Sequence, residues 1–143
     1  MAIYQLSVFM ENHAGQLAGV TDILAENGID LRALNIAEIE NYGVLRVILD
    51  DYEKGAALLT ERGHVVKVTK VISLAVPDEP GGLNEALRVL ARENINIEYM
   101  YSVFGRRQGK AYMIFKVADP DAAEEALKAA GFIPGGAEDL EIR

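Results

Sequence analysis

Apolar and polar positions along the chain follow one pattern that occurs twice. Each occurrence begins with an apolar, strand-like stretch, continues through a glycine-containing turn into an amphipathic helix pattern, and ends in Ile-Asp-Leu or Ile-Asn-Ile. The two occurrences, residues 5–31 and 71–97, align without a gap at an offset of 66 positions. Self-similarity at a fixed offset indicates an internal duplication. Residues 1–69 and 70–143 are therefore predicted to form two domains.

The elements expected within the first copy define a fold class. Periodicity predicts a strand over residues 3–10, a helix after Gly15, strands over 31–39 and 44–49, and a helix over 53–61. Gly28 ends the first helix and Asn94 takes its place in the second copy, because both residue types tolerate the left-handed conformation. With a final strand, this order is the ferredoxin-like βαββαβ arrangement. We therefore predict an α+β protein of two such units, each an antiparallel sheet with its helices on one face.

The join between the copies and the end of the chain are less regular. Residues 64–76 contain neither Gly nor Pro and are expected to supply the last strand of copy one and the first strand of copy two. A continuous strand would hold the units side by side, whereas a kink near Thr69-Lys70 is the alternative.

The second copy is expected to continue with strands over 97–104 and 110–117. A helix then begins at Asp119-Pro120-Asp121 and buries a stripe that includes Ala122 and Ala130. A short edge strand is predicted over residues 140–142.

Composition narrows the possible partners. Half of the 143 residues are apolar and a quarter are charged, as in globular domains. The net charge of -8 argues against a nucleic acid, and the cluster of Arg106, Arg107 and Lys110 fits a solvated hairpin tip. No apolar run approaches the roughly 20 residues of a membrane span, and the first residues lack the basic region of an export signal. The absence of cysteine fits a cytoplasmic location.

Catalytic chemistry has little support in the sequence. The two histidines, His13 and His64, are 51 positions apart, and solvated surface positions explain both. No zinc-protease, nucleophile-elbow, phosphate-loop or dinucleotide motif is present. We therefore predict no catalytic residue, no metal and no cofactor.

The glycine turns of the two copies are more informative. Gly15 and Gly81-Gly82 precede predicted helices, whose first N–H groups lack intrahelical partners and favour a small anion such as an amino-acid carboxylate. Glycine allows a ligand to approach the backbone closely. Asn12 or Asp78 could accept a hydrogen bond from a ligand ammonium group, and the alternative is that each caps its own helix.

These residues resemble the motif of the ACT domain. In that family Asp or Asn, Pro, Gly, x, Leu opens the first helix, and Gly, hydrophobic, Asn, Ile opens the second strand. The chain has Asn12-His13-Ala14-Gly15-Gln16-Leu17 and Asp78-Glu79-Pro80-Gly81-Gly82-Leu83, followed by Gly28-Ile29-Asp30-Leu31 and Asn94-Ile95-Asn96-Ile97. ACT domains are ferredoxin-like regulatory modules that usually bind amino acids at interfaces between two copies. The resemblance therefore implies a non-catalytic, tandem amino-acid sensor that acts through allosteric regulation.

The same resemblance assigns a set of ligand-binding positions. They are Asn12, His13, Ala14, Gly15, Gln16, Leu17, Asp78, Glu79, Pro80, Gly81, Gly82, Leu83, Asn96 and Ile97. The second copy follows the motif more closely, because Ala14 stands where the second copy has Pro80. Gly82 is expected to loosen its turn.

Other functions and partners follow from particular stretches. Residues 6–17 are similar to the opening of the small regulatory subunits of acetolactate synthase, so a regulated biosynthetic enzyme is one alternative partner. A small ferredoxin-like enzyme is an alternative of another class. Phe9, Ile48 and Ile114 place apolar groups on the sheet faces away from the motif helices, which predicts a homodimer or another partner through the sheet.

Overall fold

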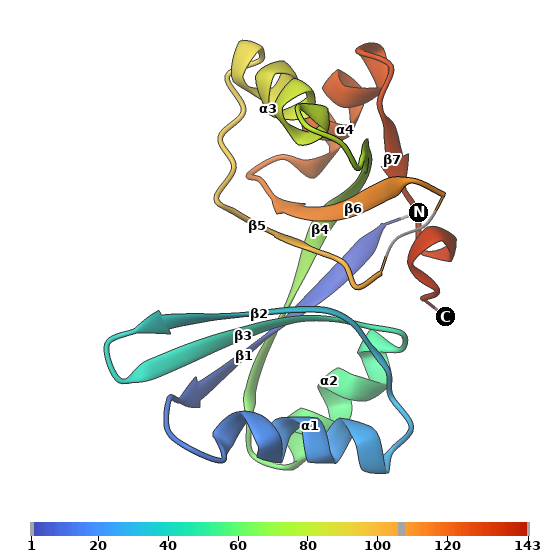
Figure 1. Ribbon diagram of the computed structural model, residues 1–143. Coiled ribbons are helices and arrows are strands. Elements are labelled where there is room, and N and C mark those ends of the chain that lie inside the picture. Colours follow the sequence, from blue (N-terminus) through green and yellow to red (C-terminus); the bar gives the residue numbers. More distant parts are fainter. Residues whose placement is uncertain (1, 106–107, 143) are drawn as a thin grey trace. The chain divides into compact units, whose positions relative to one another are not determined.

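The computed structural model describes residues 2–105 and 108–142, so Arg106 and Arg107 of the basic cluster lie outside the described residues. Figure 1 shows the helices and strands. In chain order they are β1 (Ile3–Glu11), α1 (Gln16–Glu26), β2 (Leu31–Ile39), β3 (Tyr42–Leu49), α2 (Tyr52–Glu61), β4 (Val65–Pro77), α3 (Gly82–Arg92), β5 (Tyr99–Ser102), β6 (Lys110–Lys116), α4 (Pro120–Ala129), β7 (Ile133–Gly135) and a 3-10 helix (Glu138–Leu140).

Contacts divide the chain into two compact units. The first unit comprises Tyr4–Thr69 and a short piece after Leu140, and the second comprises Lys70–Leu140 and the residues up to Ile3. Strand β4 is uninterrupted over 13 residues. Of the two alternatives predicted for this segment, the structure therefore has the continuous strand and no kink at Thr69-Lys70.

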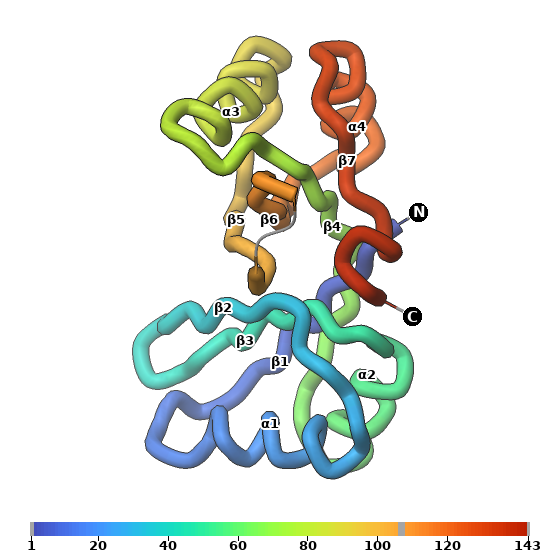
Figure 2. The backbone as a smooth tube through the Cα atoms, turned by 45° about the vertical axis from the view of Figure 1, so that its right-hand side comes forward, coloured from blue at the N-terminus to red at the C-terminus, as the bar shows by residue number. Residues whose placement is uncertain are grey.

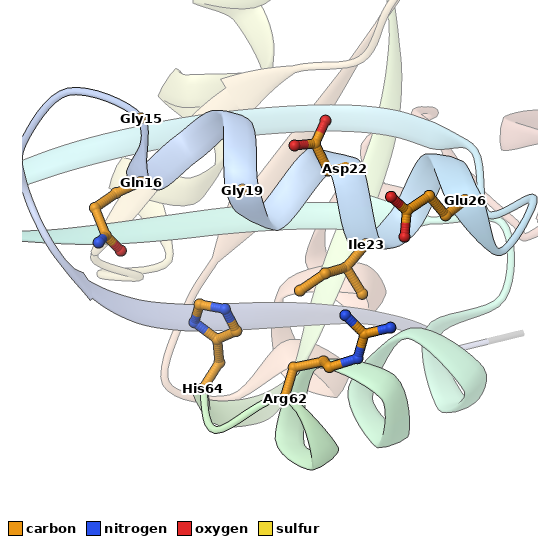
Figure 3. A pocket seen from close by; sticks show the side chains of 8 residues that line it. All are labelled: Gly15, Gln16, Gly19, Asp22, Ile23, Glu26, Arg62 and His64. Atoms are coloured by element: carbon orange, nitrogen blue, oxygen red, sulfur yellow. The ribbon is translucent and has the colours of Figure 1, made fainter.

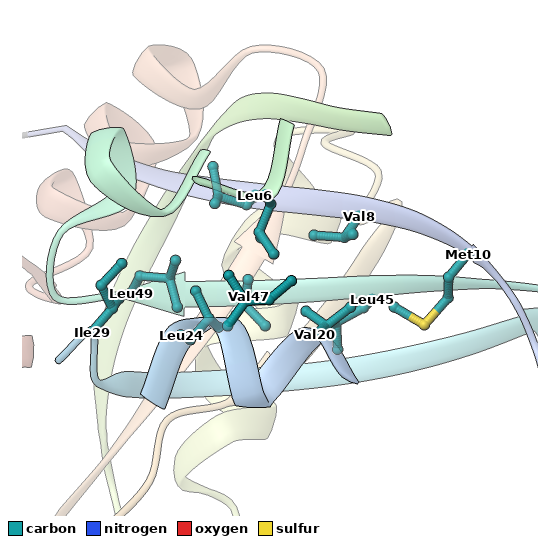
Figure 4. Packing of buried hydrophobic residues seen from close by; sticks show 11 residues of the cluster. Leu6, Val8, Met10, Val20, Leu24, Ile29, Leu45, Val47 and Leu49 are labelled. Atoms are coloured by element: carbon teal, nitrogen blue, oxygen red, sulfur yellow. The ribbon is translucent and has the colours of Figure 1, made fainter. Parts of the chain in front are cut away.

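The first unit is a sheet with strand order β2-β3-β1-β4. Helices α1 and α2 cover one face of this sheet (Figure 1). Alternation along β1 and β3 sends every second side chain toward the helices, as the opposed pair Leu6 and Val47 shows. Figure 4 shows the resulting core. Its buried members are Leu6, Val8, Met10, Val20, Ile23, Leu24, Ile29, Leu45, Val47, Leu49 and Leu59.

The second unit repeats this order. Strand β4 pairs with β6, which pairs with β5, and β7 pairs with the other side of β4. Helices α3 and α4 cover one face of the sheet (Figure 2). The core comprises Ile72, Leu74, Val76, Ala86, Val89, Leu90, Phe115, Val117, Ala123 and Leu127. The predicted α+β fold of two βαββαβ repeats is confirmed.

The predicted shared backbone requirement at the ends of the first helices is also confirmed. Gly28 and Asn94 both have positive φ, at 67° and 55°. Asn and Gly are the residues that adopt this left-handed conformation most readily. The duplication therefore preserved a backbone angle while the side chain changed.

The end of the chain differs from the prediction. The edge strand is Ile133–Gly135, and Leu140 instead lies buried in the 3-10 helix. Pro134 is opposite Leu74 at the sheet edge, where a residue without an N–H group does not interrupt a ladder. The predicted strand over 140–142 is therefore wrong, because the segment Ile133–Gly135 forms the last strand of the repeat instead.

Two smaller predictions also need correction. Strand β5 is shorter than the predicted 97–104, since it covers only Tyr99–Ser102. Ala122 and Ala130 are exposed, so the buried stripe of α4 is reduced to Ala123 and Leu127.

The sheet faces opposite the helices are only partly open. Ile48 and Ile114 have no exposed surface, whereas Phe9 is 44% exposed. Exposed apolar surface on the first sheet thus includes Phe9 but not Ile48. Among the described residues, no helix has both the length and the apolar character needed to cross a membrane.

Two serines at equivalent positions of the repeats differ in the hydrogen bonding of their buried hydroxyls. Ser7 accepts a hydrogen bond from the Gln5 amide at 3.0 Å. Ser73 is 2% exposed, and its hydroxyl has no hydrogen-bond partner among the described residues. An unsatisfied buried hydroxyl reduces stability, because it loses its bonds to water without replacement.

We expect Ser73→Ala to leave the free energy of unfolding unchanged or to raise it by about 1 kcal/mol, because it removes an unsatisfied group. The matched variant Ser7→Ala should lower that free energy by about 1 kcal/mol, because it deletes a made hydrogen bond. Urea denaturation of both variants measures the difference. A loss of stability in Ser73→Ala equal to that in Ser7→Ala would contradict this account.

Candidate functional site

The four helices begin in two different ways. Helices α2 and α4 are capped by aspartates, since Asp51 accepts from the Lys54 N–H at 3.2 Å and Asp119 from the Ala122 N–H at 3.1 Å. Helices α1 and α3 begin at Gly15 and Gly81, whose φ angles are 89° and 86°, and neither has a side-chain cap. The first N–H group of each helix is used within the turn, since the Gln16 N–H donates to the His13 carbonyl at 3.2 Å and the Gly82 N–H donates to the Glu79 carbonyl at 3.1 Å. The N–H groups that follow have no side-chain cap, which leaves them as donors for a ligand.

Asn12 and Asp78, each of which could cap the helix that follows it, instead connect their turns to a neighbouring hairpin. The Asn12 N–H donates to the Asn41 carbonyl at 2.9 Å, and the Asp78 N–H donates to the Gly109 carbonyl at 3.0 Å. These bonds tie each glycine turn to the neighbouring hairpin. The interpretation of the two residues as helix caps is wrong, because a left-handed glycine occupies the cap position in both copies.

A groove of about 500 Å³ opens beside the first glycine turn. Figure 3 shows helix α1 along one side, and Arg62 and His64 approaching from the segment between α2 and β4. The groove is lined by Gly15, Gln16, Gly19, Asp22, Ile23, Glu26, Arg62 and His64. Two of the predicted ligand-binding residues, Gly15 and Gln16, thus belong to a real concavity.

Charged side chains of both signs line this groove. Helix α1 contributes the carboxylates of Asp22 and Glu26, and the segment after α2 contributes the Arg62 guanidinium and the polar His64 imidazole (Figure 3). Gly19 lies on the groove wall, where a Cβ would meet no atom within 4 Å. A cleft with this charge arrangement suits a small zwitterion, whose two charged ends need opposite partners.

Sequence reasoning did not find these charged residues. His64, predicted to be a solvated surface residue, is half-buried in the groove. Arg62 and His64 follow a different helix from the turn, so no local motif connects them with Gly15. The one available signal was helical spacing, because Gly19, Asp22 and Glu26 recur on one face of α1.

Of the other predicted residues of the first turn, Asn12, His13 and Ala14 are exposed, whereas Leu17 is half-buried against the core of the first unit. His13 is exposed, with its Nε2 atom 3.4 Å from a Glu11 carboxylate oxygen and 3.2 Å from Gln16 Nε2. His13 Nδ1 lies 3.2 Å from the Ala14 carbonyl oxygen. These contacts order the rim of the turn.

The equivalent region of the second unit has a different character. A smaller groove of about 280 Å³ is lined by Glu85, Arg88, Val89, Arg92, Ala130 and Phe132. Arg88 and Arg92 stand at the positions of Asp22 and Glu26, and Phe132 follows α4 as His64 follows α2. All the charged lining residues, Glu85, Arg88 and Arg92, therefore come from α3, and the residues after α4 contribute no charged group to this groove.

In the second glycine turn Gly82 is packed against the preceding strand, whereas Gly81 is exposed and a Cβ there would meet no atom within 4 Å. Gly82 is buried, and a Cβ at this position would clash with the Pro77 carbonyl oxygen. The prediction that Gly82 loosens the turn is wrong, because Gly82 permits a close backbone contact rather than free movement.

The other predicted ligand residues of the second unit are spread apart. Asp78, Glu79, Pro80, Gly81 and Leu83 lie at the start of α3, whereas Asn96 and Ile97 follow its end. Helix α3 has 11 residues, which corresponds to about 16 Å. Asn96 lines a separate hollow beyond that end. Within the described residues, no group of three His, Asp or Glu side chains is arranged to hold a metal ion.

Comparisons with known proteins agree with this architecture. The family model of an ACT domain pair matches residues 1–133. A crystal structure of a protein from Bacteroides thetaiotaomicron is 36% identical with a TM-score of 0.91, and the alignment covers 99% of this chain and 96% of that chain. No curated protein sequence matches the chain.

More distant structures share the fold. The ligand-free regulatory subunit of aspartate kinase from Thermus thermophilus is 18% identical with a TM-score of 0.64, over 90% of this chain and 92% of that chain. The corresponding subunit from Thermus flavus is 16% identical with a TM-score of 0.59, over 92% and 94% of the two chains.

The two glycines of contrasting environment provide a test. We expect Gly82→Ala to lower the free energy of unfolding by about 1–3 kcal/mol, because its Cβ meets the Pro77 carbonyl. Gly19→Ala should raise it by up to about 1 kcal/mol, because Gly19 is inside a helix with open space around it. Urea denaturation measures both, and similar effects in the two variants would contradict the described packing.

Proposed function

The chain belongs to the ACT domain pair family, and from that premise we propose that it is a regulatory protein that binds a free amino acid in the groove beside α1. Residues 1–69 and 70–143 are each proposed to be one ACT domain. The protein is proposed to act by binding rather than by catalysis, with the bound amino acid as its signal.

One observation carries this proposal. The groove joins a helix start without a side-chain cap to charged residues of both signs, Asp22 and Glu26 on α1 and Arg62 from the segment after α2. The Arg62 guanidinium and the N–H groups that follow Gln16 are suited to a carboxylate. Asp22 and Glu26 are suited to the ammonium group of the same ligand.

This arrangement favours the first glycine turn over the second. The second turn follows the family motif more closely, but Gly82 is packed against Pro77 and the neighbouring groove carries two arginines on α3. The turn Asn12–Leu17 is therefore the proposed binding element. Binding by the Asp78–Leu83 turn, Asn96 and Ile97 stays a prediction.

The fold relatives suggest what the signal controls. Regulatory subunits of aspartate kinase have the same fold as this chain. By analogy, a biosynthetic enzyme is the proposed partner, with acetolactate synthase as the alternative raised by residues 6–17. A second copy of the chain, joined through a sheet or an ACT interface, is a further proposed partner.

A thermal-shift panel of the twenty amino acids at millimolar concentration tests the proposal. A ligand that binds only the folded protein stabilises it by RT ln(1 + [L]/Kd), or about 2.7 kcal/mol at 100 times Kd. We expect at least one amino acid to raise the melting temperature. No shift with any of them would contradict amino-acid binding.

Two arginine variants locate the site. Arg62→Gln should abolish the ligand-induced shift, because it removes the proposed carboxylate partner. Arg92→Gln, at the related groove of the second unit, is the matched control and should preserve the shift. The opposite result would move the site to the second unit.

Gly19→Ala separates binding from stability. A methyl group at this position projects into the groove while it improves helix propensity. We expect a higher melting temperature without ligand and a smaller shift with ligand. An undiminished shift would place the ligand elsewhere.

A further inference from the structure

The second unit contains a hollow that is separate from the groove beside α1. Its volume is about 450 Å³, and it lies where helix α3 ends and helix α4 begins. The lining residues are Asn94, Ile95, Asn96, Glu98, Ala118, Asp119 and Ala122.

Helix caps identify the same place in the first unit. Asp51 caps α2 and Asp119 caps α4, each through the N–H three residues later, so Lys54 corresponds to Ala122. Asn27 ends α1 as Glu93 ends α3. The correspondence rests on the backbone alone.

In the first unit a lysine occupies this place. The Lys54 ammonium donates to the Asn27 carbonyl at 2.8 Å and so reaches from the start of α2 to the end of α1. The end of a helix carries partial negative charge, which favours a cation. The first repeat thus supplies its own ammonium group to its helix end.

The second unit lacks both side chains that fill this region. Ala122 stands at the position of Lys54, and Ala118 at the position of Asp50. Asp50 is buried, and its carboxylate accepts from the Asp30 N–H at 3.0 Å. Replacement of these two residues by alanines accounts for the hollow.

The surroundings of the hollow retain the chemistry that suits an ammonium group. Two carboxylates, Glu98 and Asp119, and the amides of Asn94 and Asn96 supply acceptor oxygens, and no lysine or arginine is among the lining residues. The Lys116 ammonium lies 3.1 Å from a Glu98 carboxylate oxygen. The second carboxylate, that of Asp119, accepts from the Ala122 N–H and caps α4.

Asp121, the carboxylate in the first turn of α4, is already engaged. Asp121 accepts a hydrogen bond from Lys70 at 2.9 Å, which holds the pKa of the Asp121 carboxyl below its usual range. The apolar part of the wall is formed by Ile95, Ala118 and Ala122, against which an alkyl chain can pack.

We propose that this hollow binds a small-molecule primary alkylamine, whose ammonium group takes the place that the Lys54 ammonium takes in the first unit. The alkyl chain lies over Ala118 and Ala122, and the ammonium group lies at the end of α3, where Asn94 and Asn96 supply acceptor oxygens. This site is distinct from the proposed amino-acid groove, so either can fail without the other.

The n-butylammonium ion, which reproduces a lysine side chain, is the probe. Titrated into the isotope-labelled full-length protein, it should shift the backbone amide signals of Asn94, Asn96 and Ala122 saturably, with a dissociation constant on the order of millimolar for so small a ligand. Neutral n-butanol, of similar size, should produce no saturable shift. Absence of saturation, or equal shifts with both probes, would overturn the proposal.

Two reciprocal variants make the test specific. Ala122→Lys should fill the hollow with a tethered ammonium group and abolish the butylammonium shifts at Asn94 and Asn96. Lys54→Ala should create a second site, seen as new saturable shifts near Asn27. If Ala122→Lys fails to fold, the Lys54→Ala result decides, because no new shifts near Asn27 would overturn the proposed equivalence.

Discussion

A left-handed glycine at the junction of strand and helix is the constraint from which the proposed site follows. At Gly15 and Gly81 the backbone turns from a strand into a helix with positive φ, a conformation that other residues adopt at a cost. The turn takes up the first N–H group of α1 and of α3 through a backbone carbonyl, and the next N–H groups have no side-chain cap, unlike those of α2 and α4 with their aspartates. The geometry that closes the fold at this point thus also leaves hydrogen-bond donors for a ligand.

The two repeats have the same backbone fold, but their surface hollows lie at different places. The first repeat opens the groove beside α1, where Gly19 leaves space, and fills the region at the end of α1 with Lys54. The second repeat packs Gly82 of its glycine turn against Pro77 and has a hollow where alanine stands in place of that lysine. A duplication that keeps the core and changes the surface can in this way carry two different binding chemistries.

Charge placement distinguishes the two helices that follow the glycine turns. Asp22 and Glu26 on α1 become Arg88 and Arg92 on α3, although both helices bury the same kind of apolar face. Burial is decided by spacing, whereas the exposed positions are free to vary without cost to the core. Ligand preference can therefore diverge between repeats that remain equally stable.

The sequence by itself determined the duplication, the βαββαβ order and the left-handed positions 28 and 94, because these depend on local spacing and on the conformational freedom of Gly and Asn. It failed at the last strand, where Pro134 is tolerated only because of its edge position. Only the tertiary structure brought Arg62 and His64 to the same groove as Asp22 and showed that Gly82 is packed rather than loose. Both results depend on contacts between segments distant in sequence, which hydrophobic periodicity does not specify.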